Sequence, residues 1–132
     1  MTSESRHVST SIDRPAADVY HYAADPTNLP AWAPGLTSSV ELVDGRWTAE
    51  SPMGRIVIDF APRNDFGVLD HHVTVASGET FHNPMRVIGN GDGCDVVFTV
   101  RRQAGMTDAE FDRDAAAVRA DLDRLKEMME RR

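Results

Sequence analysis

The sequence contains few side chains that could do chemistry, and His71 is the best placed of them. From Leu69 to Val75, apolar and polar residues alternate, and His71 takes an apolar position between Leu69 and Val73. Alternate residues of a strand point to one face, so His71 is expected on an apolar face. There it could act as a general acid or base, or as a hydrogen-bond anchor for a ligand carbonyl or phenol. The alternative is a buried, neutral histidine that bonds only to a neighbour.

Asp70, His71 and His72 are consecutive and include possible metal ligands. Adjacent strand residues point to opposite faces, so only Asp70 and His72 can converge, and a third ligand would have to come from another strand. Metal sites normally need three or four protein ligands. The single cysteine, Cys94, also excludes an internal disulfide and a multi-thiolate site. We therefore expect neither a metal nor another cofactor.

Two residues near Pro84 could also meet a ligand. Asn83 shares a face with Phe81 and could orient a polar group of the ligand. Equally, Asn83 could satisfy a bulge beside Pro84, which has no N–H for the strand ladder. Simple alternation puts Arg86 on the opposite face, although Pro84 can shift that register. An inward Arg86 would suit an oxyanion or enolate, but a surface position is favoured because charged side chains are rarely buried.

Apolar side chains from several expected elements complete the candidate ligand site. Trp32 and Trp47 are each interpreted as either core residues or ligand contacts, since aromatic side chains line many small-molecule pockets. The residues expected to line the site are Trp32, Trp47, Ile56, Ile58, Phe60, His71, Phe81, Asn83, Phe98, Val118 and Leu122.

The elements that position these residues begin with a short strand and two short helices. Residues 7–12 alternate as a strand. Residues 16–24 form a helix with Pro15 at a first-turn position. Asp25 then caps a second short helix that starts at Pro26 and ends near Gly35.

Five turns rich in glycine or proline divide the middle of the chain into strands. The expected strands cover residues 37–43, 46–51, 55–61, 68–76, 79–89 and 94–102. Short connections make neighbouring strands pair antiparallel, as a six-stranded meander with one apolar and one wet face.

The C-terminal region predicts one long helix over residues 108–131. Thr107 and Glu110 form a capping box at its start. Its apolar stripe comprises Phe111, Ala115, Val118, Leu122, Leu125 and Met129. This stripe must cover something apolar, and the apolar face of the sheet is the one candidate large enough.

Composition fits a single domain over residues 1–132, with 41% hydrophobic and 27% charged residues. The net charge of −7 argues against nucleic acid and anionic membrane surfaces as partners. No apolar run reaches the length of a membrane span, and the polar N-terminus lacks the pattern of a signal peptide, so a cytoplasmic location is expected. The pattern indicates no particular oligomeric state.

The order of a strand, two short helices, a six-stranded meander and a long helix resembles the START-like helix-grip superfamily, also called SRPBCC. Within it, the chain resembles the polyketide cyclase/dehydrase-like branch. The stretches that carry the resemblance are His7–Pro15 leading into Val19–Tyr20, Asp25–Pro26 with Trp32, Gly67–His71, Arg86–Val87 before Asn90–Gly91, Val97–Thr99 before Gly105–Thr107, and Asp121–Leu122 with Leu125–Lys126. They span nearly the whole chain. Members of the superfamily bind lipids, hormones or polyketides, or catalyse cyclisation, and no single catalytic signature runs through them, so the resemblance implies a fold and no catalytic residue.

A curved sheet that grips one helix often leaves a cavity of roughly 300–1,000 Å³ between them. Three functions are then open. The chain could bind an apolar lipid or aromatic molecule, it could be a polyketide cyclase or dehydratase using pocket acid and base residues, or it could be an interaction module with a filled core. We favour the first, because the sequence offers an apolar face but no convincing pair of acid and base.

Overall fold

Strand β1 (Ser5–Ile12) pairs antiparallel with strand β8 (Gly93–Arg101), although most of the chain separates them in sequence. The computed structural model describes all residues from 1 to 132. Strand β7 (Met85–Asn90) completes a three-stranded sheet in the order β1-β8-β7. This sheet therefore joins the N-terminal strand to the last strand of the chain.

The second sheet has five strands in the order β2-β3-β4-β5-β6. Their bounds are β2 (Ser39–Val43), β3 (Arg46–Ser51), β4 (Gly54–Phe60), β5 (His71–Thr74) and β6 (Thr80–Asn83). All pairs are antiparallel neighbours in sequence, as expected for a meander. Together with the helices, the two sheets confirm the predicted α+β helix-grip architecture.

The predicted strand 79–89 is wrong as a single element, because Pro84 divides it into β6 and β7. Pro84 has no N–H to donate, so the ladder cannot pass through it. Strand β6 pairs with β5 before this point, and β7 pairs with β8 after it. The Pro84 carbonyl accepts a hydrogen bond from the Thr99 N–H at 3.0 Å. The chain therefore changes sheets at Pro84.

The predicted strand 68–76 is also shorter than expected, because its first residues join the two sheets instead of extending β5. The Leu69 N–H donates to the Met85 carbonyl at 2.8 Å, and the Val87 N–H donates to the Gly67 carbonyl at 2.9 Å. On its other side, the Asp70 carbonyl accepts from the Ala61 N–H. Residues 67–70 thus connect β4 of one sheet with β7 of the other, and the two sheets form one bent surface.

The short helices are α1 (Ala16–Ala23), the 3-10 turn η1 (Pro26–Asn28) and α2 (Leu29–Trp32). Pro15 was predicted in the first turn of α1, but it is the N-cap, one position before the first helical residue. The Asp25 side chain accepts from the Thr27 N–H at 3.0 Å, which confirms the predicted cap. The second helical segment ends at Trp32, three residues before Gly35.

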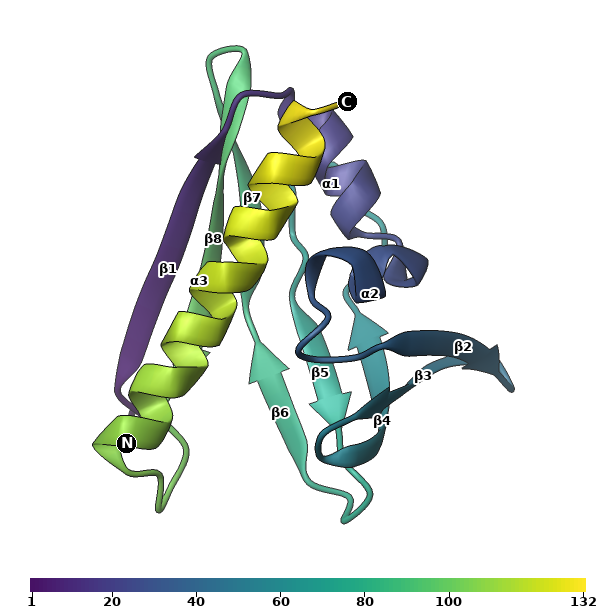
Figure 1. Cartoon of the computed structure of the whole chain (residues 1–132), viewed down its shortest axis with the longest axis vertical. Helices are drawn as coiled ribbons and strands as arrows, with labels where there is room; N and C mark the ends of the chain where they lie inside the picture. Colours follow the sequence, from purple (N-terminus) through teal and green to yellow (C-terminus); the bar gives the residue numbers. More distant parts are fainter.

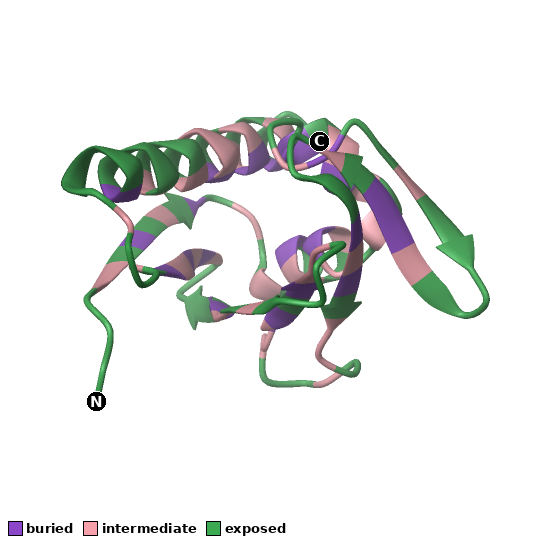
Figure 2. Cartoon of the chain, turned by 90° about the horizontal axis from the view of Figure 1, so that it is seen from below, coloured by how far each residue is buried: buried purple, intermediate pink, exposed green.

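Helix α3 (Asp108–Glu130) begins with the predicted capping box between Thr107 and Glu110. It packs against β1, β8 and α2, and Figure 1 shows it running alongside β1 and β8 with α1 near its C-terminal end. Figure 2 shows that exposed residues cover its outer side. Its predicted stripe faces inward, with Phe111, Leu122, Leu125 and Met129 fully buried and Ala115 and Val118 half-buried.

Two cations also bind α3 to the backbone of β1. Lys126 donates to the Ser11 carbonyl and Arg119 donates to the Ser9 carbonyl, at 2.6 and 2.7 Å.

None of the helices combines the length and the apolar character that a membrane span requires.

Candidate functional site

Strand register places most of the predicted ligand residues on one face of the sheet. Trp47 lies opposite Ile58, Phe60 lies opposite His71, and His71 lies opposite Asn83 on the next strand. Residues directly opposite on antiparallel strands share a face. The same pairings bring Ile56 and Phe81 to this face, which we call the concave face.

His71 is the buried polar residue at the centre of the concave face. Its imidazole ring lies between two aromatic rings, with ring centroids 4.9 Å from Phe60 and 5.8 Å from Phe98. The Phe60 ring is tilted against it and the Phe98 ring meets it edge-on. The local cause is the period of the strand, which places His71 on the same side as the buried Leu69 and Val73.

The hydrogen bonds of His71 determine which of its nitrogens can meet a ligand. Its Nδ1 lies 3.0 Å from the Leu69 carbonyl oxygen, which can only accept, so Nδ1 carries a proton in this contact. Its Nε2 has no hydrogen-bond partner in the chain. In the neutral ring Nε2 therefore carries a free lone pair.

Burial lowers the pKa of His71, because removing the ring from water disfavours the charged form. The hydrogen bond to Leu69 and the negative charge of Asp70 oppose this shift. The net direction is downward, so the histidine stays neutral at pH 7 and its Nε2 is available as an acceptor or base.

Asn83 is the second polar group on this face. It is half-buried, and its side-chain amide forms no hydrogen bond within the chain. Because Asn83 and His71 are direct cross-strand neighbours, their Cβ atoms lie about 4.5–5.5 Å apart. The concave face thus carries two adjacent polar side chains whose hydrogen-bonding groups are free.

The predicted ligand residues separate into two groups by exposure. Trp32, Ile56, Ile58 and Leu122 are at most 3% exposed and belong to the packed core. They offer no surface to a ligand in this conformation. Half-buried residues that keep accessible surface are Trp47, Phe60, Phe81, Asn83, Phe98 and Val118. The Trp32 indole Nε1 is buried without a hydrogen-bond partner.

The residues considered for a metal, Asp70 and His72, have other partners on the opposite face. Asp70 accepts two hydrogen bonds from Arg86, at 2.8 and 3.0 Å, and one from the Met85 N–H at 2.9 Å. These contacts lower the pKa of Asp70, and the hydrogen bond from Arg86 is the largest cause. His72 stacks on His82 with ring centroids 4.8 Å apart. No group of three or more His, Cys, Asp or Glu residues is arranged to hold a metal ion.

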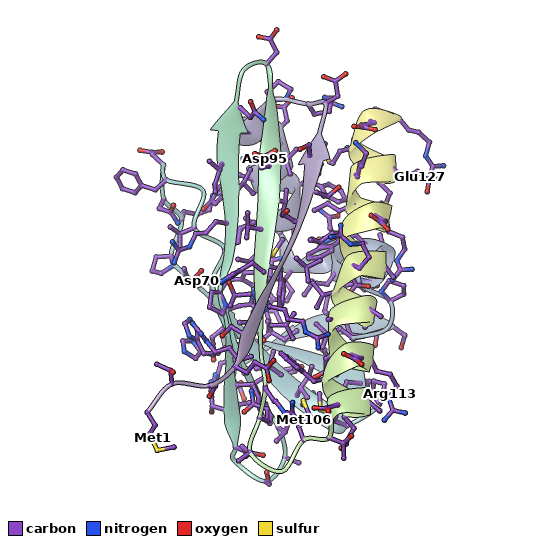
Figure 3. All side chains as sticks on the ribbon, turned by 90° about the vertical axis from the view of Figure 1, so that its left-hand side faces the viewer. Met1, Asp70, Asp95, Met106, Arg113 and Glu127 are labelled. Atoms are coloured by element: carbon purple, nitrogen blue, oxygen red, sulfur yellow. The ribbon has the colours of Figure 1, made fainter.

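Arg86 lies on the surface, where its guanidinium is held by Asp70. Figure 3 shows Asp70 beside the strands on the side away from α3. Arg86 therefore contributes to the joint between the sheets and does not reach the concave face.

The sequence did not predict the cleft of about 640 Å³ that lies between α1, the loop of residues 62–67 and β7. Its walls include Tyr20 and His21 of α1, Phe66 of the loop and Ile88 of β7. A smaller cleft of about 310 Å³ lies where β1 ends beside the β7–β8 turn. Neither contains any of the predicted ligand residues. The 62–67 loop was interpreted only as a turn, and the one signal in the sequence is a phenylalanine inside it.

Comparison with known proteins gives a family match and fold neighbours. The family model described as polyketide cyclase / dehydrase and lipid transport matches residues 5–130. No curated protein matches the sequence.

Among solved structures, an uncharacterized protein from Bacillus thuringiensis is similar with a TM-score of 0.75, at 16% identity over 95% of this chain and 98% of that one. Truncated norcoclaurine synthase from Thalictrum flavum is similar with a TM-score of 0.65, at 14% identity over 98% and 96% of the two chains. The di-domain ARO/CYC protein BexL of the BE-7585A biosynthetic pathway is similar with a TM-score of 0.70, at 19% identity over 96% of this chain and 46% of that one. At these identities the likeness shows the fold.

Proposed function

This chain belongs to the polyketide cyclase / dehydrase and lipid transport family, and from this premise we propose that it binds an apolar, ring-containing small molecule on the concave face. The observation that carries the proposal is the adjacent pair of His71 and Asn83. Both have free hydrogen-bonding groups on a face otherwise lined by half-buried aromatic side chains. Small-molecule sites combine such apolar walls with a few converging polar groups.

The apolar walls supply the binding free energy. Phe60, Phe81 and Phe98 keep accessible surface on the concave face, as does Trp47. Each 100 Å² of apolar surface that a ligand covers contributes about 2.5 kcal/mol. The same incomplete burial supports a ligand site over an interaction module with a filled core.

The polar pair, His71 and Asn83, determines which chemical groups the ligand should carry at the end that it contacts. Since the His71 Nδ1 proton is directed at Leu69, Nε2 accepts a hydrogen bond and favours a hydroxyl or an N–H of the ligand over a carbonyl. The Asn83 amide can donate to a neighbouring carbonyl and accept from a hydroxyl. A phenol or enol beside a carbonyl satisfies both side chains.

The second candidate function is a cyclase or dehydratase, and the unpartnered Nε2 of a neutral His71 favours it. In such a reaction Nε2 takes the acidic proton between two carbonyls, and the enolate carbon forms a bond to the carbon of a third carbonyl, whose C=O π bond breaks to leave an alkoxide. The imidazolium then returns the proton to the new alkoxide oxygen. Solved neighbours include the ARO/CYC protein BexL and norcoclaurine synthase.

Thermal unfolding with a ligand panel tests the binding proposal. The panel contains fatty acids, sterols, flavonoids and aromatic polyketides. A ligand at a hundred times its dissociation constant adds about 2.7 kcal/mol to the free energy of unfolding, and the midpoint then rises by roughly 5–12 °C. We expect one ring-containing class to raise it.

Variants then test the site itself. His71→Phe is expected to weaken binding of that class about tenfold, since it removes one hydrogen bond. The matched control is His72→Phe, which changes the neighbouring residue on the opposite face and leaves affinity unchanged. No shift with any class, or equal affinities for the two variants, would refute the proposed site. Turnover of a poly-β-ketone that is lost in His71→Phe would establish the second function.

A further inference from the structure

We propose that the 62–67 loop and the 640 Å³ cleft beside it form a self-complementary surface through which two copies of this chain associate. The cleft lies outside the concave face and contains no residue of the proposed ligand site. Its loop carries Phe66, whose exposed fraction is 84%, and Ile88 on the neighbouring strand β7 is 51% exposed. Exposed apolar residues gathered at one cleft are typical of interaction surfaces.

The loop that presents Phe66 is held rigidly by Asn64. The Asn64 Oδ1 accepts from the backbone N–H groups of Phe66 and Val68, both at 3.0 Å. Its Nδ2 donates to the carbonyls of Pro62 and Val68, at 2.9 and 3.0 Å. The Asn64 N–H donates to the Tyr20 hydroxyl of α1 at 3.1 Å. The backbone that carries Phe66 is therefore preorganised, which lowers the entropy lost on association.

Gly67 attaches the same loop to β7. Its φ of +72° lies in the left-handed region, and a Cβ atom there would lie 2.0 Å from the Val87 carbonyl oxygen. Glycine is thus required for this close approach. The lining of the cleft also includes the small residues Ala16, Ala17 and Gly89, which leave room for an incoming aromatic ring.

The charges of the loop match a second copy of the same loop. Arg63 and Asp65 both line the cleft, and neither forms an ion pair within the chain. Arg63 instead donates to His21 Nδ1 at 2.6 Å and lies 5.1 Å from the centre of the Tyr20 ring. In a two-fold interface the same patch meets itself. Arg63 of each copy then faces Asp65 of the other, while each Phe66 enters the opposite cleft.

The size of the surface predicts a weak dimer. A stable interface covers about 800 Å² on each partner and about 20–30 residues. That area is about a tenth of the 7524 Å² surface of this chain, whereas 12 residues line the cleft. We therefore expect weak association that depends on protein concentration.

Sedimentation velocity on the full chain from about 5 to about 500 µM tests this interface, because association of two copies increases with concentration by mass action. We expect the 14.6 kDa species to shift toward twice that mass as concentration rises. Phe66→Ser should weaken association at least tenfold, and Met53→Ser, which changes an exposed apolar residue on another turn, should leave it unchanged. Both side chains are exposed in the monomer, so circular dichroism spectra should match the wild type.

Charge exchange tests the two-fold geometry. Asp65→Arg alone places arginines against each other and should abolish the dimer. The double variant Arg63→Asp with Asp65→Arg restores the opposite charges across the two-fold axis and should recover it. A wild type that stays monomeric over the whole range, or a Phe66→Ser variant that dimerises like the wild type, would overturn the inference.

Discussion

Replacing Gly67 with alanine should weaken the joint between the two sheets far more than the same change at another turn. In this chain Gly67 and Gly45 both have positive φ, +72° and +79°. Alanine in this region costs about 1–2 kcal/mol at either position. Gly45 has no heavy atom within 4 Å of the added Cβ, so Gly45→Ala should show this cost alone.

At Gly67 the added Cβ also meets the Val87 carbonyl oxygen at 2.0 Å, and ordinary contact begins at 3.4 Å. The two backbones must separate by the difference, about 1.4 Å. That movement breaks the hydrogen bond from the Val87 N–H to Gly67 and strains the one from Leu69 to Met85. Each lost buried hydrogen bond costs about 1–3 kcal/mol. Gly67→Ala should therefore lower the free energy of unfolding about 2–4 kcal/mol more than Gly45→Ala does.

Urea unfolding of both variants, followed by far-UV circular dichroism, measures this difference. If the free energy of unfolding falls with urea concentration at the same slope in both variants, both unfold from an equally compact state. A difference below about 1 kcal/mol between the two alanine variants would refute the reasoning, because it would mean that residues 67–70 do not join the sheets through these hydrogen bonds.

Three further outcomes follow from the same contacts. The folded pKa of His71 lies below its unfolded value of about 6.5, so the unfolded state takes the proton first and the free energy of unfolding should fall as pH drops below that value. In urea titrations at pH 7.5 and 5, His71→Phe should not show this part of the decrease in the free energy of unfolding. An equal decrease in the variant and the wild type would contradict the assignment. Asp70→Asn should cost about 1–2 kcal/mol at pH 7, because the charged contact with Arg86 is lost. The control is Asp59→Asn, which breaks the exposed ion pair with Arg46 and should cost under about 0.5 kcal/mol. Equal costs for the two variants would count against a role for Asp70 in joining the sheets. Thr107→Ala should lower the stability by about 1 kcal/mol in thermal unfolding, because the helix cap is lost, whereas Thr107→Ser should keep most of that stability. Equal stability of the wild type and Thr107→Ala would show that the cap contributes nothing.

Local patterns in the sequence were sufficient for the helix caps and for the orientation of the central site residue. The capping box of Thr107 and Glu110 and the cap at Asp25 involve residues two or three positions apart, so the sequence contains all the atoms concerned. The inward orientation of His71 follows from the period of two in a strand. These features depend on neighbours along the chain, which is why they could be predicted.

Contacts between distant segments could not be predicted in the same way. Asn83 lies beside His71 because β5 and β6 pair in one register, and a shift of one residue would turn Asn83 to the other face. Pro84 indicated an interrupted strand, but only the competing partners β5 and β8 determine that the chain changes sheets there.

Exposure is also a property of the assembled molecule. Ile58 and Phe60 have the same alternation in sequence, yet packing encloses the first and leaves the second half-buried. The cleft beside Phe66 exists because α1, the 62–67 loop and β7 meet there, and those three segments are far apart along the chain. Sequence periodicity determined which side chains point inward, whereas the tertiary structure decided which of them remain accessible, because accessibility depends on the sum of packing contacts from the whole chain.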